Sequence, residues 1–117
     1  MGIITGVGDR RDEDIIALGE EAARIFDEII IRHDDDMRGR TIEEVENLVT
    51  SGIVNVKAGI PITYSMAECE AVEFAIDHAV PDSLIVVLTE NIKKVTDCVL
   101  NYQQKFKEQN QHWEKAV

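Results

Sequence analysis

Short apolar runs alternate with amphipathic helical patterns along this chain, and this alternation limits its fold more than any other feature. Residues 3–5 form an apolar run that a glycine-containing turn joins to a helical pattern over 12–26. The same order returns where a β-branched run at 28–32 leads, through a polar loop, to a helix that begins at Thr41. Such short, continuously apolar runs are typical of strands that are buried on both faces of a parallel sheet.

Capping signals mark where the next helices begin. Thr41 and Glu44 form a capping box, and the helix that they open is expected to end near Ser51 and Gly52. Residues 65–68 form a second capping box, which is expected to open a third helix.

The remaining segments complete the alternation. Extended chain is indicated within 53–64, an unbroken aliphatic run at 84–88 is the clearest strand, and residues 89–91 cap a long last helix. Strand–helix units repeated about four times predict a Rossmann-like α/β fold, in which a mostly parallel sheet carries helices on both faces. We expect one domain over 1–102 and a polar helical tail over 103–117.

The charge of the chain limits its partners. The 117 residues carry 12 basic and 23 acidic side chains, which gives a formal net charge of −11. Duplex nucleic acid requires basic surface, so nucleic acid is not an expected partner, whereas a nucleotide requires only a local cluster of donors. No apolar run approaches the ~18 residues of a membrane span, and no secretory signal is present. We therefore expect a cytoplasmic protein with no membrane partner.

The two cysteines, Cys69 and Cys98, form no CxxC and no Cys/His metal pattern. Each falls inside a predicted helix beside apolar neighbours. We interpret them as buried free thiols of a protein in a reducing compartment.

Two polar loops follow the first and second predicted strands, and both combine aspartates with arginines. The first contains Gly8, Asp9, Arg10 and Arg11 just before a helix begins. Ligands of parallel sheets bind beyond the carboxyl ends of the strands, where backbone N–H groups and the helix dipole favour anions. Arginine adds a planar, bidentate donor for phosphate or carboxylate. The alternatives are a tight glycine turn and a surface ion-pair cluster.

The second loop contains Asp36, Arg38 and Arg40, preceded by Asp34 and Asp35. Three consecutive carboxylates diverge along a loop and no EF-hand spacing follows, so we do not expect a metal site. These aspartates are better interpreted as acceptors for a ligand, a cationic group or the nearby arginines. If the two strands are neighbours, both loops lie at one edge of one sheet.

Several catalytic motifs are absent from the sequence. The chain contains no GxxxxGK[ST] phosphate loop, no GxSxG, no HExxH and no Cys/His pair in a catalytic context. Glu68 and His78 have no partner in the sequence that would mark acid–base chemistry. The chain therefore has residues that can hold a ligand, and we predict no catalytic residue.

Four segments resemble the carboxy-terminal domain of the Mur ligase family, in particular its cyanophycin synthetase branch. They are GVGDRRDEDI at 6–15, DEIIIR at 27–32, DDDMRGRT at 34–41 and EAVEFAI…DSLIVVLTE at 70–90. The resemblance covers about residues 2 to 100. It implies an ATP-dependent ligase that forms an acyl-phosphate on a carboxylate, which an amine then attacks to form an amide.

The resemblance also implies roles for the two loops. Gly8, Asp9, Arg10 and Arg11 would face the nucleotide, and Asp36, Arg38 and Arg40 would contact the amino-acid substrate. ATP would be the cofactor, with its magnesium held through a central domain of the family that this chain lacks. The chain is then not catalytic alone, and its expected partners are a nucleotide or small amino acid, a ligase central domain, or a second copy of itself.

The family's domain also begins with a strand and a helix that have no counterpart before residues 3–5. We expect their absence to leave an open sheet edge or an uncovered packing face. The alternative to a ligase domain is a stand-alone, non-catalytic binding or self-assembly module derived from it.

Overall fold

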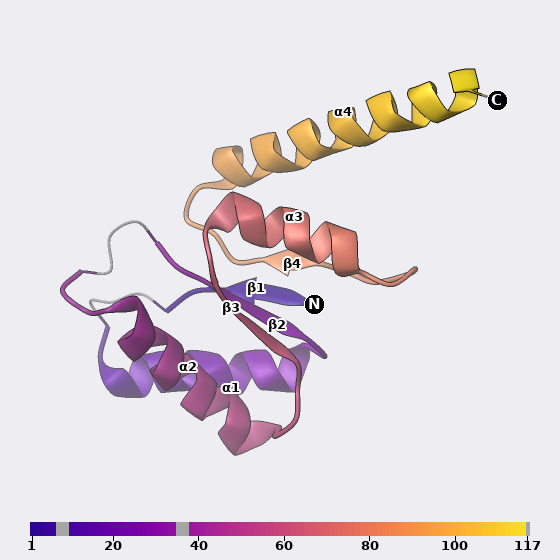
Figure 1. Ribbon diagram of the computed structural model, residues 1–117. Coiled ribbons are helices and arrows are strands. Elements are labelled where there is room, and N and C mark those ends of the chain that lie inside the picture. Colours follow the sequence, from indigo (N-terminus) through magenta and orange to yellow (C-terminus); the bar gives the residue numbers. More distant parts are fainter. Residues whose placement is uncertain (7–9, 35–37, 117) are drawn as a thin grey trace.

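A computed structural model of the chain describes residues 1–6, 10–34 and 38–116. For residues 65, 66 and 109–116 it describes the backbone alone. Strands and helices alternate through these residues (Figure 1). In chain order they are β1 (Gly2–Ile4), α1 (Asp12–Ile25), β2 (Ile29–Arg32), α2 (Ile42–Val56), β3 (Ile62–Met66), α3 (Glu68–His78), β4 (Val86–Val87) and α4 (Ile92–Ala116). The predicted α/β alternation is confirmed.

The four strands described form one parallel sheet in the order β3-β2-β1-β4. Gly2, Ile3 and Ile4 of β1 pair with Ile29, Ile30 and Ile31 of β2, so the first two strands along the chain are neighbours. After β3 the chain crosses back over β2 and β1 to place β4 on the other side of β1. The order of the strands therefore reverses between β1 and β4, which is where open α/β sheets bind ligands.

Alternate residues of the central strands face opposite helical layers. Ile4, Ile29 and Ile31 are buried against α1 and α2, whereas Ile3 and Ile30 are buried against α3. Val95 packs on the same face of the sheet as α3, so the first turn of α4 belongs to the helical layer that covers this face. Figure 1 shows α1 and α2 below the sheet, with α3 and α4 above it. Both faces of the central strands are thus covered, which explains their continuous isoleucine runs.

The capping box at Thr41 is confirmed, because its side chain accepts a hydrogen bond from the Glu44 amide at 3.1 Å. The second predicted capping box is wrong. Residues 65 and 66 belong to β3, and α3 begins at Glu68 after Ala67, which has no side chain to cap it. The strand pairing of β3 with β2, which extends to Met66, takes precedence over the local capping signal.

The predicted last strand is also shorter than expected. Only Val86 and Val87 are strand residues, because β4 lies at the sheet edge and pairs only with the short β1. Leu84 and Leu88 at its ends are 75% and 44% exposed, so the aliphatic run is not buried throughout.

The predicted end of α2 near Gly52 is wrong, because the helix continues to Val56. Gly52 is a contact point with α1 and not a helix terminus. A Cβ at Gly52 would lie 2.0 Å from the Ile16 carbonyl oxygen, and a Cβ at Gly19 of α1 would lie 2.1 Å from the Val49 carbonyl oxygen. Two glycines, one on each helix, therefore let the backbones of α1 and α2 touch.

The interpretation of the cysteines as free thiols is wrong. Cys69 at the start of α3 and Cys98 in α4 form a disulfide, with their Cα atoms 5.8 Å apart. The two residues occupy neighbouring helices of successive strand–helix units, a proximity that their separation of 29 residues does not reveal. The disulfide ties α4 to α3.

None of the helices described combines the length and apolar character that crossing a membrane would require.

We predict that Gly52→Ala destabilises the protein by about 3 kcal/mol, because its methyl group would overlap the Ile16 carbonyl. Intrinsic helix propensity alone predicts the opposite sign, a gain of about 1 kcal/mol. Urea unfolding monitored by circular dichroism measures the difference. Ser51→Ala is the matched control, since Ser51 is exposed on the same helix, and it should change stability by less than about 0.5 kcal/mol. A stabilising Gly52→Ala would contradict the close contact.

Candidate functional site

The two Asp/Arg loops meet at the carboxyl ends of β1 and β2, as predicted from the order of the strands. Arg40 joins them. Its Nη2 donates to the Arg10 carbonyl oxygen at 3.1 Å and to Asp12 Oδ1 at 2.6 Å. The second loop is therefore attached to the first turn of α1. Arg40 has at least a structural role at this edge of the sheet.

Arg11 precedes the first residue of α1 and pairs with the acidic residues of the first turn. Its Nε donates to Asp14 Oδ2 at 3.1 Å, and its Nη1 lies 3.7 Å from Glu13 Oε2. The hydrogen bond with Asp14 raises the pKa of the Arg11 guanidinium, and the same bond lowers the pKa of the Asp14 carboxyl. The side chain is 74% exposed, which is the surface ion-pair arrangement recognised as an alternative from the sequence.

Arg10 has a different position, because it lines a pocket of about 500 Å³ at the carboxyl ends of β1 and β4. This is the point where the strand order reverses. Its lining combines apolar side chains with charged and hydroxyl groups, a combination common in small-molecule sites. The pocket is lined by Thr5, Arg10, Asp14, Ile15, Ala17, Leu18, Glu21, Arg32, Leu88, Thr89 and Glu90.

Arg32, the last residue of β2, connects three segments beside this pocket. Its side chain is only 4% exposed. Nη1 donates to Asp34 Oδ1 at 2.6 Å, and Nη2 donates to the Leu88 carbonyl oxygen at 3.1 Å. The Arg32 guanidinium therefore links the ends of β2 and β4.

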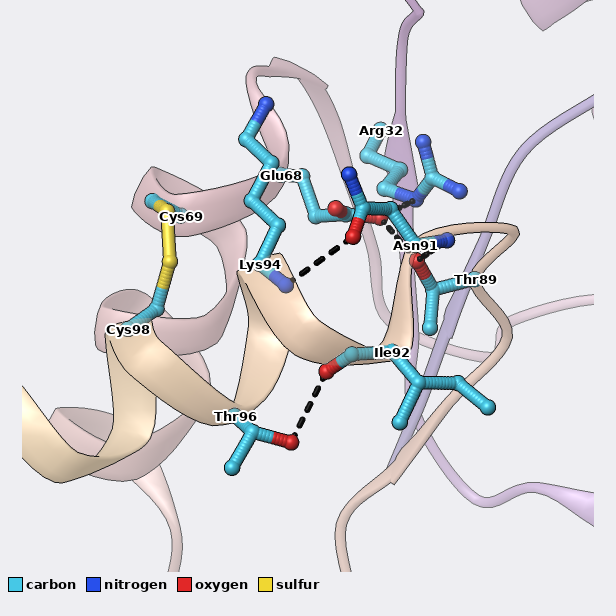
Figure 2. The surroundings of a disulfide bond; sticks show 9 residues. All are labelled: Arg32, Glu68, Cys69, Thr89, Asn91, Ile92, Lys94, Thr96 and Cys98. Carbon is cyan, nitrogen blue, oxygen red and sulfur yellow. Dashed lines mark hydrogen bonds and ion pairs between the residues drawn. A yellow bond between two sulfur atoms is a disulfide. The ribbon is translucent and has the colours of Figure 1, made fainter.

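Glu68 completes this cluster from the first turn of α3. Its Oε2 lies 3.1 Å from Arg32 Nε, but the N–H is not aimed at that oxygen, so the interaction is an ion pair and not a hydrogen bond. The same Oε2 accepts a hydrogen bond from Thr89 Oγ1 at 2.8 Å. Figure 2 shows Arg32, Glu68 and Thr89 converging beside the start of α4, and Glu68 directly precedes Cys69 of the disulfide. Charges that are this deeply buried persist only with such partners.

A second, more polar pocket of about 180 Å³ lies on the other side of this cluster. Arg32, Thr89 and Glu90 line both pockets, so the cluster separates them. The starts of α3 and α4 meet here, and Asn91 caps α4 by accepting from the Lys94 amide at 3.0 Å. The remaining lining residues are His33, Asp34, Ala67, Glu68, Asn91 and Lys94.

The residues proposed from the sequence fall into four groups. Arg10 lines the larger pocket, whereas Arg11 and Arg40 are engaged in contacts within the chain. Arg38 lies in an exposed turn with φ 53°, next to Gly39 with φ 89°. Gly8, Asp9 and Asp36 lie outside the described residues.

Sequence reasoning missed Arg32, Glu68 and Thr89. The sequence marks no acid–base partner for Glu68, and in the structure its partners are Arg32 of β2 and Thr89 of the loop after β4. A signal was present at Arg32, because a charged residue that ends an isoleucine run of a buried strand requires a buried counter-charge. The sequence does not say which of the many acidic residues supplies it.

The described residues include no group of three or more His, Cys, Asp or Glu side chains arranged to hold a metal ion. The larger pocket brings Arg10 beside the start of α1. Arg10 offers a cation, no side chain caps the start of α1, and all three acidic residues in its first turn are paired with arginines. That pairing reduces the repulsion that an anion would otherwise meet there.

Comparison with known proteins identifies relatives of one kind. The chain is 40% identical to cyanophycin synthetase of Nostoc sp. over 94 residues, 36% identical to that of Crocosphaera subtropica over 99 residues, and 38% identical to that of Synechocystis sp. over 99 residues. These alignments cover 80–85% of this chain. The chain spans only about a tenth of the length of these relatives, 10–11%. No protein-family model matches the sequence.

We predict that Glu68→Gln destabilises the protein by about 3 kcal/mol, because it leaves the buried Arg32 cation without its buried counter-charge. The variant Arg32→Met/Glu68→Gln removes both charges and should be less unstable than the sum of its two single variants. Urea unfolding of all four proteins gives the coupling energy, which we expect to be about 1–3 kcal/mol. Additive effects would show that the two charges do not interact.

Proposed function

The chain is homologous to one region of cyanophycin synthetase, and on this premise we propose that it is the carboxy-terminal, nucleotide- and substrate-contacting domain of an ATP-dependent amide ligase. In this proposal it belongs to the Mur type of ligase domain. It holds no catalytic residue of its own, and a separate central domain supplies the magnesium ligands and the phosphate loop. The chain contributes binding and orientation.

The observation that carries the proposal is the pocket at the reversal of strand order, with Arg10 among its lining residues. Arg10 is the residue of the first loop that is available to a phosphate, and the start of α1 lies beside it. Ala17, Leu18 and Leu88 offer apolar surface for a base. Glu21 and Glu90 offer acceptors for ribose hydroxyl groups.

The second, smaller pocket is the proposed site of the amino substrate. Its lining includes Asp34 and Glu68, which are paired with Arg32, as well as Lys94 and Glu90. We assign the Glu90 carboxylate to a cationic group of the substrate such as a guanidinium. In the loop that follows β2, Arg38 and Arg40 would face an acidic group of the substrate. Asp36 of this loop, which lies outside the described residues, would do so with them. Because Thr89 and Glu90 line both pockets, nucleotide and amino substrate would bind side by side.

The proposed location is the cytoplasm, where ligases of this kind obtain ATP. Disulfides are rare in reducing compartments, so the Cys69–Cys98 bond weighs against this location.

The second candidate is a non-catalytic binding or self-assembly module. One observation favours it: several large apolar side chains of α4, including Ile92 and Phe106, are more than half exposed. Exposed apolar surface of this kind marks interaction sites. The two candidates are separated by nucleotide binding, which the assembly module does not require.

We predict that Arg10→Ala weakens ATP or ADP binding about 10- to 100-fold, the loss expected for one charge-assisted contact to phosphate. Arg11→Ala is the matched control. It should change affinity less than about threefold, because Arg11 pairs with Asp14 at the surface. Titration calorimetry with ATP, ADP and arginine, each with and without magnesium, measures these affinities. A loss of affinity that is larger for Arg11→Ala than for Arg10→Ala would contradict the assignment of the pocket. If the chain binds no nucleotide at all, the binding or self-assembly module becomes the favoured function.

A further inference from the structure

The last helix continues well beyond the layer that it packs on. α4 contains 25 residues, about 37 Å of helix, whereas its neighbour α3 contains 11. Figure 1 shows the second half of α4 extending past the end of α3, away from the sheet. A polar helix gains little stability from propensity alone and is usually stabilised by packing of an apolar face.

Two stripes of side chains run along α4 at coiled-coil spacing. The first, Val95, Cys98 and Tyr102, faces α3: Val95 joins the core, Cys98 forms the disulfide, and Tyr102 bonds to Asp77. The second stripe consists of Ile92, Val99 and Phe106, exactly one heptad apart, and these side chains are 74%, 40% and 54% exposed. No described residue of this chain covers the second stripe.

A groove lies along this stripe, with a volume of about 540 Å³, and its wall on α3 is formed by Ile76 and Asp77. The stripe and the groove together form a surface suited to one more helix, which we call the α4 seam.

The spacing of the α4 seam makes it complementary to itself. Val99 lies seven residues from both Ile92 and Phe106. If two copies pack antiparallel about a two-fold axis at Val99, each Val99 meets its counterpart, and each Ile92 meets Phe106 of the other copy. Such an interface is isologous and closes after two chains.

The charge distribution favours the same arrangement. Residues 92–116 carry five lysines and three acidic residues, whereas the rest of the chain carries seven basic and twenty acidic residues. A parallel pair would place two acidic bodies side by side. An antiparallel pair centred on Val99 lays Lys105 and Lys107 of each copy beside the start of the other copy's α4, next to the acidic body that carries Glu90.

We propose that the chain forms a symmetric homodimer through antiparallel pairing of its α4 seams. This proposal depends on α3 and α4 and not on the nucleotide assignment, so each can fail without the other. A pair of helices of this length forms an interface near the lower end of the standard size, and we expect a Kd on the order of 10 µM.

Sedimentation velocity over a concentration series, from about 1 to about 300 µM, tests the dimer with the full chain. Phe106→Glu should weaken the dimer at least about 10-fold, since it buries a charge against an apolar residue. Asn101→Glu is the matched control: it adds the same charge on the opposite, exposed side of α4 and should leave the dimer intact. Circular dichroism establishes that both variants remain folded, as expected for substitutions at exposed positions.

A charge exchange tests the direction of the pairing. In the variant Ile92→Lys/Phe106→Glu, the antiparallel dimer brings each lysine opposite a glutamate, so dimer formation should recover relative to Phe106→Glu. A parallel pair would bring like charges together and would not recover. A wild-type chain that stays monomeric throughout, a dimer insensitive to Phe106→Glu, or the absence of recovery would each overturn the proposal.

Discussion

The arrangement of the loops at the carboxyl ends of the strands depends on one buried cation, the guanidinium of Arg32. It hydrogen-bonds the Leu88 carbonyl and Asp34 and pairs with Glu68, so it joins the end of β2, the end of β4 and the start of α3. Replacing one partner leaves a buried charge, whereas apolar packing in its place would not specify which loops meet. The same guanidinium lies between the two pockets, so their relative position follows from it.

The parallel sheet then determines where chemistry is possible. Since β1 and β2 are adjacent, the loops after them converge, and since β4 crosses to the other side of β1, a pocket opens between β1 and β4. Within the first loop, two neighbouring arginines differ in role. Arg11 is engaged by the acidic first turn of α1, whereas Arg10 lines the pocket. The residue type alone does not predict which of the two arginines lines the pocket.

Much of the architecture was predictable because it rests on local patterns. Isoleucine runs at 3–4 and 29–31 identify strands buried on both faces, and Thr41 caps its helix as the sequence indicates. The errors occur where a distant contact prevails. Gly52 resembles a helix terminus but sits against the backbone of α1, and residues 65–66 resemble a cap but are taken into β3 by pairing with β2.

The sequence by itself determined the order of strands and helices, the parallel sheet, and the meeting of two Asp/Arg loops at its edge, because periodicity and capping act over a few residues. The tertiary structure alone decided which acid accompanies Arg32, which arginine faces the pocket, that Cys69 meets Cys98, and which side of α4 stays uncovered. Each of these depends on groups that the fold brings together from separate strand–helix units. A local sequence pattern does not predict contacts between residues that are far apart in the sequence.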